Sequence, residues 1–289
     1  MPYLYLILSV LIASSSTILA GFYERTAENK KNASILYTAL IALSVSLFWI
    51  VRFCFDRTVD LAVLPYALLF GTFYIVCTIG IIYAMKTGPV VLTSLLVQLA
   101  LIGTTVWGFF FWGTEFSILV GIGLVLVVAA LFLCLWSGKN TSGVKINGRW
   151  ILWALCGFIG NAGCAITQKT QQMNFDGQYG NFLMMVGSLV VGLLCFVWFL
   201  FSDKSELRSV PRKAYPFPLV SGFVNGFLNL FIILLATSSL SPSLIYPTLA
   251  IGSLMVNIVF SAFVFKEKMR WWQWVGVGIG ALATGILSL

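Results

Sequence analysis

The residues best suited to hold a small molecule are side-chain amides and hydroxyls that interrupt long apolar runs. Hydrocarbon offers these groups no hydrogen-bond partner, so they must face protein, water or a ligand. Many recur three or four residues apart, which places them on one face of a helix. With two tyrosines that add rings and hydroxyls, the candidate substrate-binding residues are Ser14, Thr17, Tyr74, Gln98, Asn161, Gln168, Asn225, Asn229, Tyr246 and Asn257.

Four asparagines lie within about four residues, or about 6 Å, of the centres of their apolar runs. We expect them to line one cavity near the bilayer midplane: Asn161, Asn225, Asn229 and Asn257. The alternative is that each amide only bonds one helix to another, a contact worth about 0.6 kcal/mol on average.

Ionisable groups are rare inside the apolar runs. All nine acidic residues lie in loops or at helix ends, and Lys86 and Lys169 are expected to end their helices and reach the interface. The chain has no histidine, and its six cysteines form no CxxC pair. These features predict no catalytic residues, no metal site and no cofactor, so we expect no enzyme. A neutral or zwitterionic cargo suits such an interior.

The composition indicates whether this chain lies in water or in a membrane. Of 289 residues, 60% are hydrophobic and 9% are charged, and the mean hydropathy is +1.00. A soluble domain carries about 25% charged residues. A soluble enzyme, a nucleic-acid binder and a disordered chain are therefore excluded. We expect an integral membrane protein, all α-helical, whose partners are the lipid bilayer and a small-molecule substrate and not nucleic acid.

Ten segments are long and apolar enough to span a bilayer, which takes about 20 residues. We expect helices over 3–23, 34–54, 61–84, 89–112, 117–136, 150–168, 179–201, 216–237, 242–265 and 271–289.

The basic residues predict the orientation of these helices. Of the 17 lysines and arginines, 14 fall in the loops after the odd-numbered segments. Cytoplasmic loops carry the excess of basic residues. We therefore place these loops in the cytoplasm and both termini on the extracytoplasmic side.

The two halves of the chain resemble each other. The fourth segment opens with Gly88-Pro89 and ends near Glu115, and the ninth opens with Ser241-Pro242 and ends near Glu267. We expect a first five-helix repeat over 1–136, a cytoplasmic linker over 137–149 and a second repeat over 150–289. Five helices per half give the halves opposite orientations, so the repeats are inverted.

The same features carry a resemblance to a known family. Ten helices in 5+5 halves, and a glutamate closing the fourth and ninth helices, resemble the drug/metabolite transporter superfamily, EamA-like branch. The best stretch is Phe263-Val264-Phe265-Lys266-Glu267-Lys268 with Gln273, Gly276 and Gly280. The resemblance implies a central cavity lined by helices near a pseudo-twofold axis. The opening, Pro2 to Leu6, also looks like small multidrug resistance proteins, but Ala13 stands where those carry a glutamate.

The sequence thus predicts a secondary transporter or permease of the bacterial cytoplasmic (inner) membrane. It would move a small neutral or zwitterionic metabolite, amino-acid-like, by alternating access. An exporter of cationic aromatic or quaternary ammonium compounds is one alternative, and a non-transporting membrane scaffold is another. The Gly276–Gly280 pair makes a homodimer possible, against the alternative of close packing within one chain.

Overall fold

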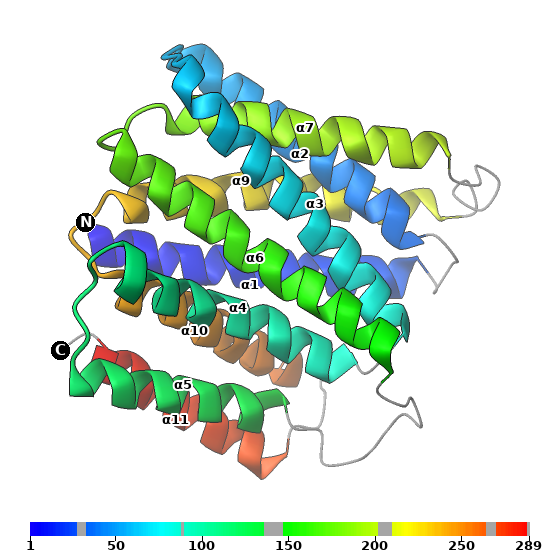
Figure 1. Ribbon diagram of the computed structural model, residues 1–289. Helices are drawn as coiled ribbons and strands as arrows, with labels where there is room; N and C mark the ends of the chain where they lie inside the picture. Colours follow the sequence, from blue (N-terminus) through cyan, green and yellow to red (C-terminus); the bar gives the residue numbers. More distant parts are fainter. Residues whose placement is uncertain (28–32, 88–89, 136–146, 202–209, 264–269, 288–289) are drawn as a thin grey trace. The chain divides into compact units, whose positions relative to one another are not determined.

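The structure is a computed structural model that describes residues 1–27, 33–87, 90–135, 147–201, 210–263 and 270–287. Over these ranges the chain forms helices and no strand (Figure 1). The α-helices are α1 (Pro2–Thr26), α2 (Ala33–Phe55), α3 (Leu64–Thr87), α4 (Val90–Phe111), α5 (Ile118–Leu135), α6 (Gly148–Asn174), α7 (Gly180–Leu200), α9 (Pro216–Ala236), α10 (Pro242–Phe263) and α11 (Trp271–Leu287). Two short 3₁₀ turns, η1 (Leu61–Val63) and η2 (Arg212–Ala214), precede α3 and α9.

The helices coincide with the ten expected segments, because each apolar run must satisfy its own backbone inside a membrane. Seven stretches of the described chain are long and apolar enough to cross one, and shorter apolar helices cover Leu96–Phe111 and Ile118–Cys134. Local signals set several starts. Pro216 and Pro242 begin α9 and α10, where the missing N–H costs nothing. The Asn147 side chain accepts from the Trp150 N–H at 2.8 Å and caps α6.

One boundary is wrong in the sequence analysis. The sixth segment was expected to end at 168, but α6 continues to Asn174 and includes Lys169. Polar residues after Gln168 ended the apolar run, yet the helix continues because their side chains find polar partners within the protein, in other helices, in the turn before α7 and in α6 itself.

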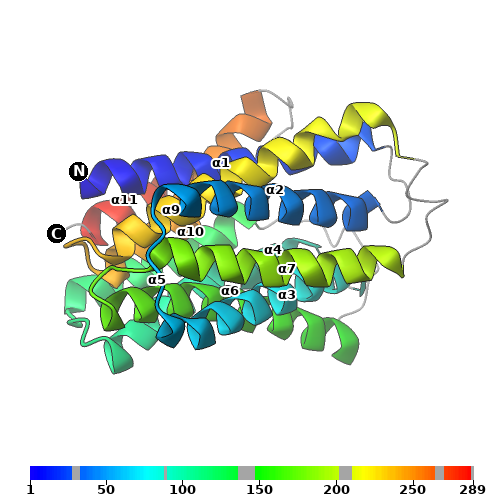
Figure 2. The same cartoon turned by 90° about the horizontal axis from the view of Figure 1, so that it is seen from above.

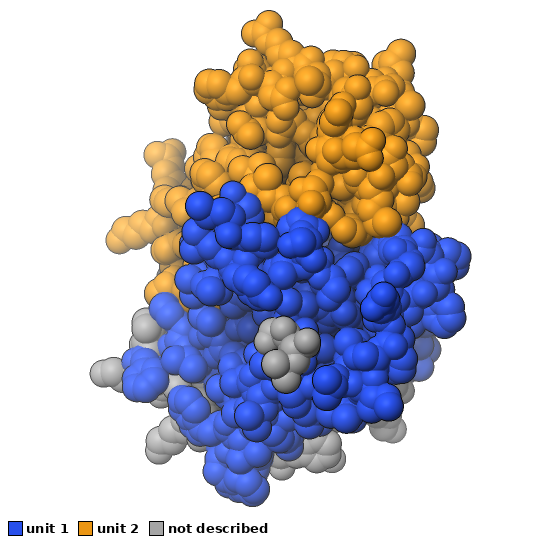
Figure 3. All heavy atoms as spheres, turned by 90° about the vertical axis from the view of Figure 1, so that its left-hand side faces the viewer, with its two compact units in different colours: residues 1–11, 76–166, 238–289 blue, residues 12–75, 167–237 orange. Residues whose placement is uncertain are grey.

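The chain forms two compact units, each built from both halves of the sequence (Figure 3). Unit 1 comprises 1–11, 76–166 and 238–289, and unit 2 comprises 12–75 and 167–237. Helices α1, α3 and α6 each contribute one part to either unit. This division follows packing, so the proposed repeats over 1–136 and 150–289 stay a prediction.

In unit 1, α5 lies along α11, and α10 contacts α4, α5 and α11. The α5–α11 pair is plain in Figure 1. Glycines allow the close approach: a Cβ on Gly276 would lie 2.9 Å from the Cys134 nitrogen, and one on Gly280 would lie 2.6 Å from Ile251 Cγ1. The Gly276–Gly280 pair therefore packs within the chain, and the homodimer stays a prediction.

In unit 2, α2 packs against both α7 and α9. Figure 2 shows α2 and α7 running side by side. The α2–α9 contact is tight because a Cβ on Gly222 would lie 2.8 Å from the Ile41 carbonyl oxygen. Small residues allow helices to approach in this way where lipid removes the hydrophobic drive to associate. Unit 2 therefore holds α2, α7 and α9 closely around the polar residues of α9.

Candidate substrate-binding site

A polar stripe runs along α9 inside unit 2. Ser221, Asn225 and Asn229 are four residues apart and so lie on one helical face. Ser221 and Asn229 are buried, and Asn225 is partly buried. Over eight residues this stripe extends about 12 Å, roughly two-fifths of a hydrocarbon thickness of about 30 Å.

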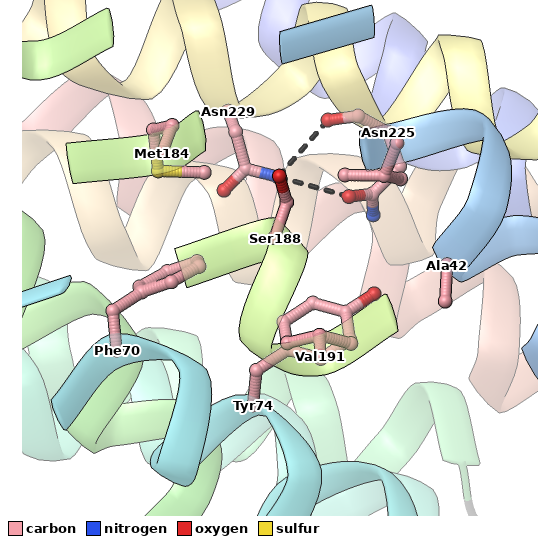
Figure 4. Close-up of a pocket in the computed structure, with 9 residues that line it drawn as sticks. Ala42, Phe70, Tyr74, Met184, Ser188, Val191, Asn225 and Asn229 are labelled. Atoms are coloured by element: carbon pink, nitrogen blue, oxygen red, sulfur yellow. Dashed lines mark hydrogen bonds between the residues drawn. The ribbon is translucent and has the colours of Figure 1, made fainter. Parts of the chain in front are cut away.

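The two asparagines and Gln168 of α6 form a chain of amides. Asn229 Nδ2 donates to the backbone oxygen and to Oδ1 of Asn225, both at 2.9 Å (Figure 4). Asn229 Oδ1 accepts from Gln168 Nε2 at 2.9 Å, and Gln168 Nε2 also lies 3.2 Å from Met184 Sδ. Asn229 therefore uses both ends of its amide within the protein, which fixes its rotamer.

Asn225 differs from Asn229 in what it leaves free. Its Oδ1 accepts from Asn229, whereas its Nδ2 has no partner among the residues that the structure describes. Asn225 also lines a cavity. In Figure 4 the nitrogen lies on the far side of the amide from Asn229. Asn225 therefore presents an oriented hydrogen-bond donor to this cavity.

The cavity lies among α2, α3, α7 and α9 of unit 2. Its lining is mostly apolar with a few polar groups, the usual character of a small-molecule site. The lining residues are Ala42, Val45, Phe70, Tyr74, Met184, Ser188, Val191, Asn225 and Asn229. The space for the centres of water-sized molecules is about 10 Å³, roughly what one water requires. A metabolite therefore binds here only when the lining helices move apart.

Serine and tyrosine hydroxyls continue the stripe toward the start of α9. Ser221 Oγ lies 3.2 Å from Ser16 Oγ of α1 and 3.2 Å from the Tyr37 hydroxyl of α2. The Tyr23 hydroxyl donates to the Ala33 carbonyl at 2.7 Å and ties the end of α1 to the start of α2. Hydroxyls can exchange donor and acceptor roles, so this end of the stripe suits ligands or waters of either polarity.

A second polar group lies toward the end of α9, and sequence reasoning identified only Gln168 of it as a candidate. Four neighbouring residues of α6 are at most 9% exposed: Gln168, Lys169, Gln171 and Gln172. Lys169 does not end its helix as expected, and its Nζ donates to the Ala236 carbonyl at the end of α9. That it reaches the interface stays a prediction. The sequence did contain an indication of this group, because two glutamines follow Gln168 at a spacing of three and four residues, which is typical of one helical face. Their polarity was instead interpreted as a loop.

The remaining candidates divide between the units. Ser14 is fully buried in unit 2, and the side chain of Thr17 lies outside the described residues. Unit 1 holds Gln98, Asn161, Tyr246 and Asn257. The structure thus brings Tyr74, Gln168, Asn225 and Asn229 together, and the single cavity for all four asparagines stays a prediction.

The candidates of unit 1 differ in their bonding. Asn161 Nδ2 donates to the Val97 carbonyl of α4 at 2.9 Å, so it joins two helices. The Tyr246 ring is buried, with its centroid 6.3 Å from that of Trp112. Asn257 Oδ1 is buried and has no partner within the described structure. Asn257 is therefore a unit 1 amide with a buried acceptor left to satisfy.

Metal chemistry finds no support in the described part of the chain. No group of three histidine, cysteine, aspartate or glutamate side chains there could hold an ion. The six cysteines are free thiols.

Comparison with known proteins finds a family match in the second half of the chain. Residues 148–289 match the EamA-like transporter family. The chain carries an EamA-like transporter domain. Members of this family are transporters rather than enzymes, and with the apolar helices this identifies an integral membrane protein.

The EamA-like domain supplies α6, α7 and α9 of the candidate site, and residues before it supply α2 and α3. A solved crystal structure of a protein resembles the whole chain, with a TM-score of 0.72 and 12% identity over 99% of this chain and 95% of the other. At this identity the likeness concerns the fold alone. No curated protein matches the chain.

Proposed function

We propose that this EamA-like protein is a secondary transporter or permease that moves a small neutral or zwitterionic metabolite, amino-acid-like, by alternating access. The observation that carries the proposal is the amide chain of unit 2, which ends in the free Nδ2 of Asn225 at the cavity. Such a donor recognises a carboxylate or carbonyl oxygen. No carboxylate lines the cavity within the described residues, so a cation finds no counter-charge there.

Helix packing supports an inverted repeat. Helices five apart in the ten-helix order pack against each other inside one unit: α2 with α7, α4 with α10 and α5 with α11. A pseudo-twofold axis relating the halves brings such pairs together. Alternating access then follows as a change that opens the small cavity of unit 2. We place the protein in the bacterial inner membrane with both termini extracytoplasmic, because of the basic loops.

Uptake into liposomes tests this function. Purified protein is reconstituted, and counterflow of individually radiolabelled amino acids is measured. We expect saturable flux of at least one neutral amino acid, and Asn225→Leu to raise its KM about tenfold, since that corresponds to about 1.4 kcal/mol. Asn174→Leu is the matched control, because this exposed amide donates to the Tyr66 hydroxyl at 2.8 Å and does not line the cavity. Flux of no amino acid contradicts the proposal.

One observation favours export of cationic aromatic or quaternary ammonium compounds instead. Phe70 and Tyr74 both line the cavity, with ring centroids 6.1 Å apart and planes tilted by 43°. Ring faces attract quaternary ammonium groups even without a carboxylate. In the same liposomes, tetramethylammonium flux that Tyr74→Leu abolishes and Asn225→Leu leaves intact would favour this alternative.

A further inference from the structure

Lys169 is a cation in an unusual place for a membrane protein. It lies inside α6, five residues before the helix ends, and it is 9% exposed. Its one polar partner within the described residues is the Ala236 carbonyl. Ala236 ends α9, where the helix dipole contributes about half a negative charge. The lysine is therefore only partly compensated, and an ionisable group within a membrane span is usually functional.

The acidic side chains of unit 2 do not complete the charge balance. Asp56 accepts from Asn181 Nδ2 at 2.9 Å, and Asp60 accepts from the Ala62 N–H at 2.9 Å. Asp176 is exposed in the turn after α6. Among the described carboxylates, none forms an ion pair with Lys169.

Gln172 adds a second unsatisfied group beside the lysine. It is 2% exposed, its Nε2 donates to Gln171, and its Oε1 is buried without a partner. A Cβ on Gly180 would lie 3.0 Å from both Gln172 Nε2 and Ile233 Cγ2. Gln172 and Ile233, which lies in the last turn of α9, are thus both beside Gly180. Ala236 of the same turn accepts from Lys169.

Lys169 and Gln172 lie three residues apart on α6. Residues three apart on a helix have Cβ atoms about 5–6 Å apart. Lys169 offers N–H donors with positive charge, and Gln172 offers an acceptor. A molecule that carries a carboxylate next to an ammonium satisfies both.

We infer that Lys169 and Gln172 form a carboxylate-selecting subsite at the α9 end of unit 2, separate from the cavity at Asn225, where Lys169 binds the substrate's carboxylate and Gln172 Oε1 accepts from its ammonium. This inference rests on the proposed function and deepens it, because it selects zwitterions over simple cations. A lysine that only caps α9 is the competing explanation.

Thermal unfolding with small probes separates the two. Acetate should raise the Tm of the wild type, and acetamide, which has the same shape without the charge, should not. Lys169→Gln should abolish the acetate effect, whereas the matched control Lys213→Gln, which removes an exposed charge from η2, should retain it. Glycine should raise the Tm of the wild type more than acetate does, because it also carries an ammonium group. In Gln172→Leu the two molecules should raise the Tm equally. An equal acetate effect in Lys169→Gln, or none in the wild type, overturns the subsite.

A second measurement needs no variant to fold. Cyanate carbamylates free amines, and mass spectrometry reports each lysine of the wild type. Acetate should slow carbamylation of Lys169 severalfold and leave Lys213 unchanged; equal rates at Lys169 with acetate and acetamide contradict the subsite. If no amino acid is transported into liposomes but acetate still raises the Tm through Lys169, the result counts against the proposed function alone. Flux without a lysine-dependent acetate effect counts against the subsite alone.

Discussion

Asn225 and Asn229 carry the same side chain on one stripe of α9, yet their replacement by leucine should affect different properties of the protein. Asn229 makes three hydrogen bonds, two to Asn225 and one to Gln168. Asn225 contributes one side-chain acceptor to this set and keeps its Nδ2 for the cavity. Asn229→Leu should therefore lower stability, and Asn225→Leu should lower substrate affinity.

The magnitudes follow from the bond count. Side-chain hydrogen bonds between membrane helices average about 0.6 kcal/mol. Of the three bonds of Asn229, only the one to Gln168 joins two helices. Its loss predicts that Asn229→Leu lowers the free energy of unfolding by about 0.6 kcal/mol, whereas Asn225→Leu breaks no bond between helices among the described residues and should lower it by less. A cycle of Asn229→Leu with Gln168→Leu should give a coupling energy of about 0.6 kcal/mol, since the two residues share one bond.

Titration with dodecyl sulfate in mixed micelles measures the free energy of unfolding, and liposome counterflow measures KM. The reasoning is refuted if Asn225→Leu loses more stability than Asn229→Leu. It is also refuted if Asn229→Leu raises KM tenfold at unchanged stability.

Three other results are expected. Single cysteines at Ser142 and Ser205, in a background without native cysteines, should resist an impermeant thiol reagent in intact cells; labelling of both from outside contradicts the orientation. Neither Glu115→Gln nor Glu267→Gln should abolish transport, because no carboxylate was found inside an apolar run of the sequence and no single acid is expected to be an obligatory proton carrier; loss of proton-driven transport with substrate exchange preserved would reject this. Gly222→Val should cost about 1–3 kcal/mol by overpacking against α2, whereas Gly278→Ala, with open space around the glycine, should not lower the unfolding midpoint.

The helices were predictable from the sequence because the membrane makes each apolar run satisfy its own backbone. Pro216 and Pro242 even mark the first residues of α9 and α10. The end of α6 was not predictable in this way. Hydropathy treats Gln171 as a loop residue, whereas its Nε2 donates to the Gln178 carbonyl at 2.9 Å and its side chain is fully buried.

The candidate site was predictable in part. The spacing of Asn225 and Asn229 placed them on one helical face. Because hydrocarbon offers an amide no hydrogen-bond partner, the sequence also predicted that they find polar partners within the protein. Which amide keeps a free donor depends on the partner from another helix, here Gln168. That choice follows from packing between distant segments, which the spacing of residues along one helix does not contain. The apolar part of the lining, such as Phe70 and Val191, was unpredictable for the same reason.

Each compact unit combines helices from both halves of the sequence, and this has a consequence for how the chain folds. Within unit 2, α2 has its neighbours α7 and α9 from the second half, and within unit 1, α5 has α11. Residues 148–289, although they match a family as one block, leave α11 without α5 when expressed alone. We expect neither half to fold by itself. Two fragments divided within 137–149 and co-expressed should instead complement each other, so the inherited module and the cooperative folding unit of this protein are different pieces of chain.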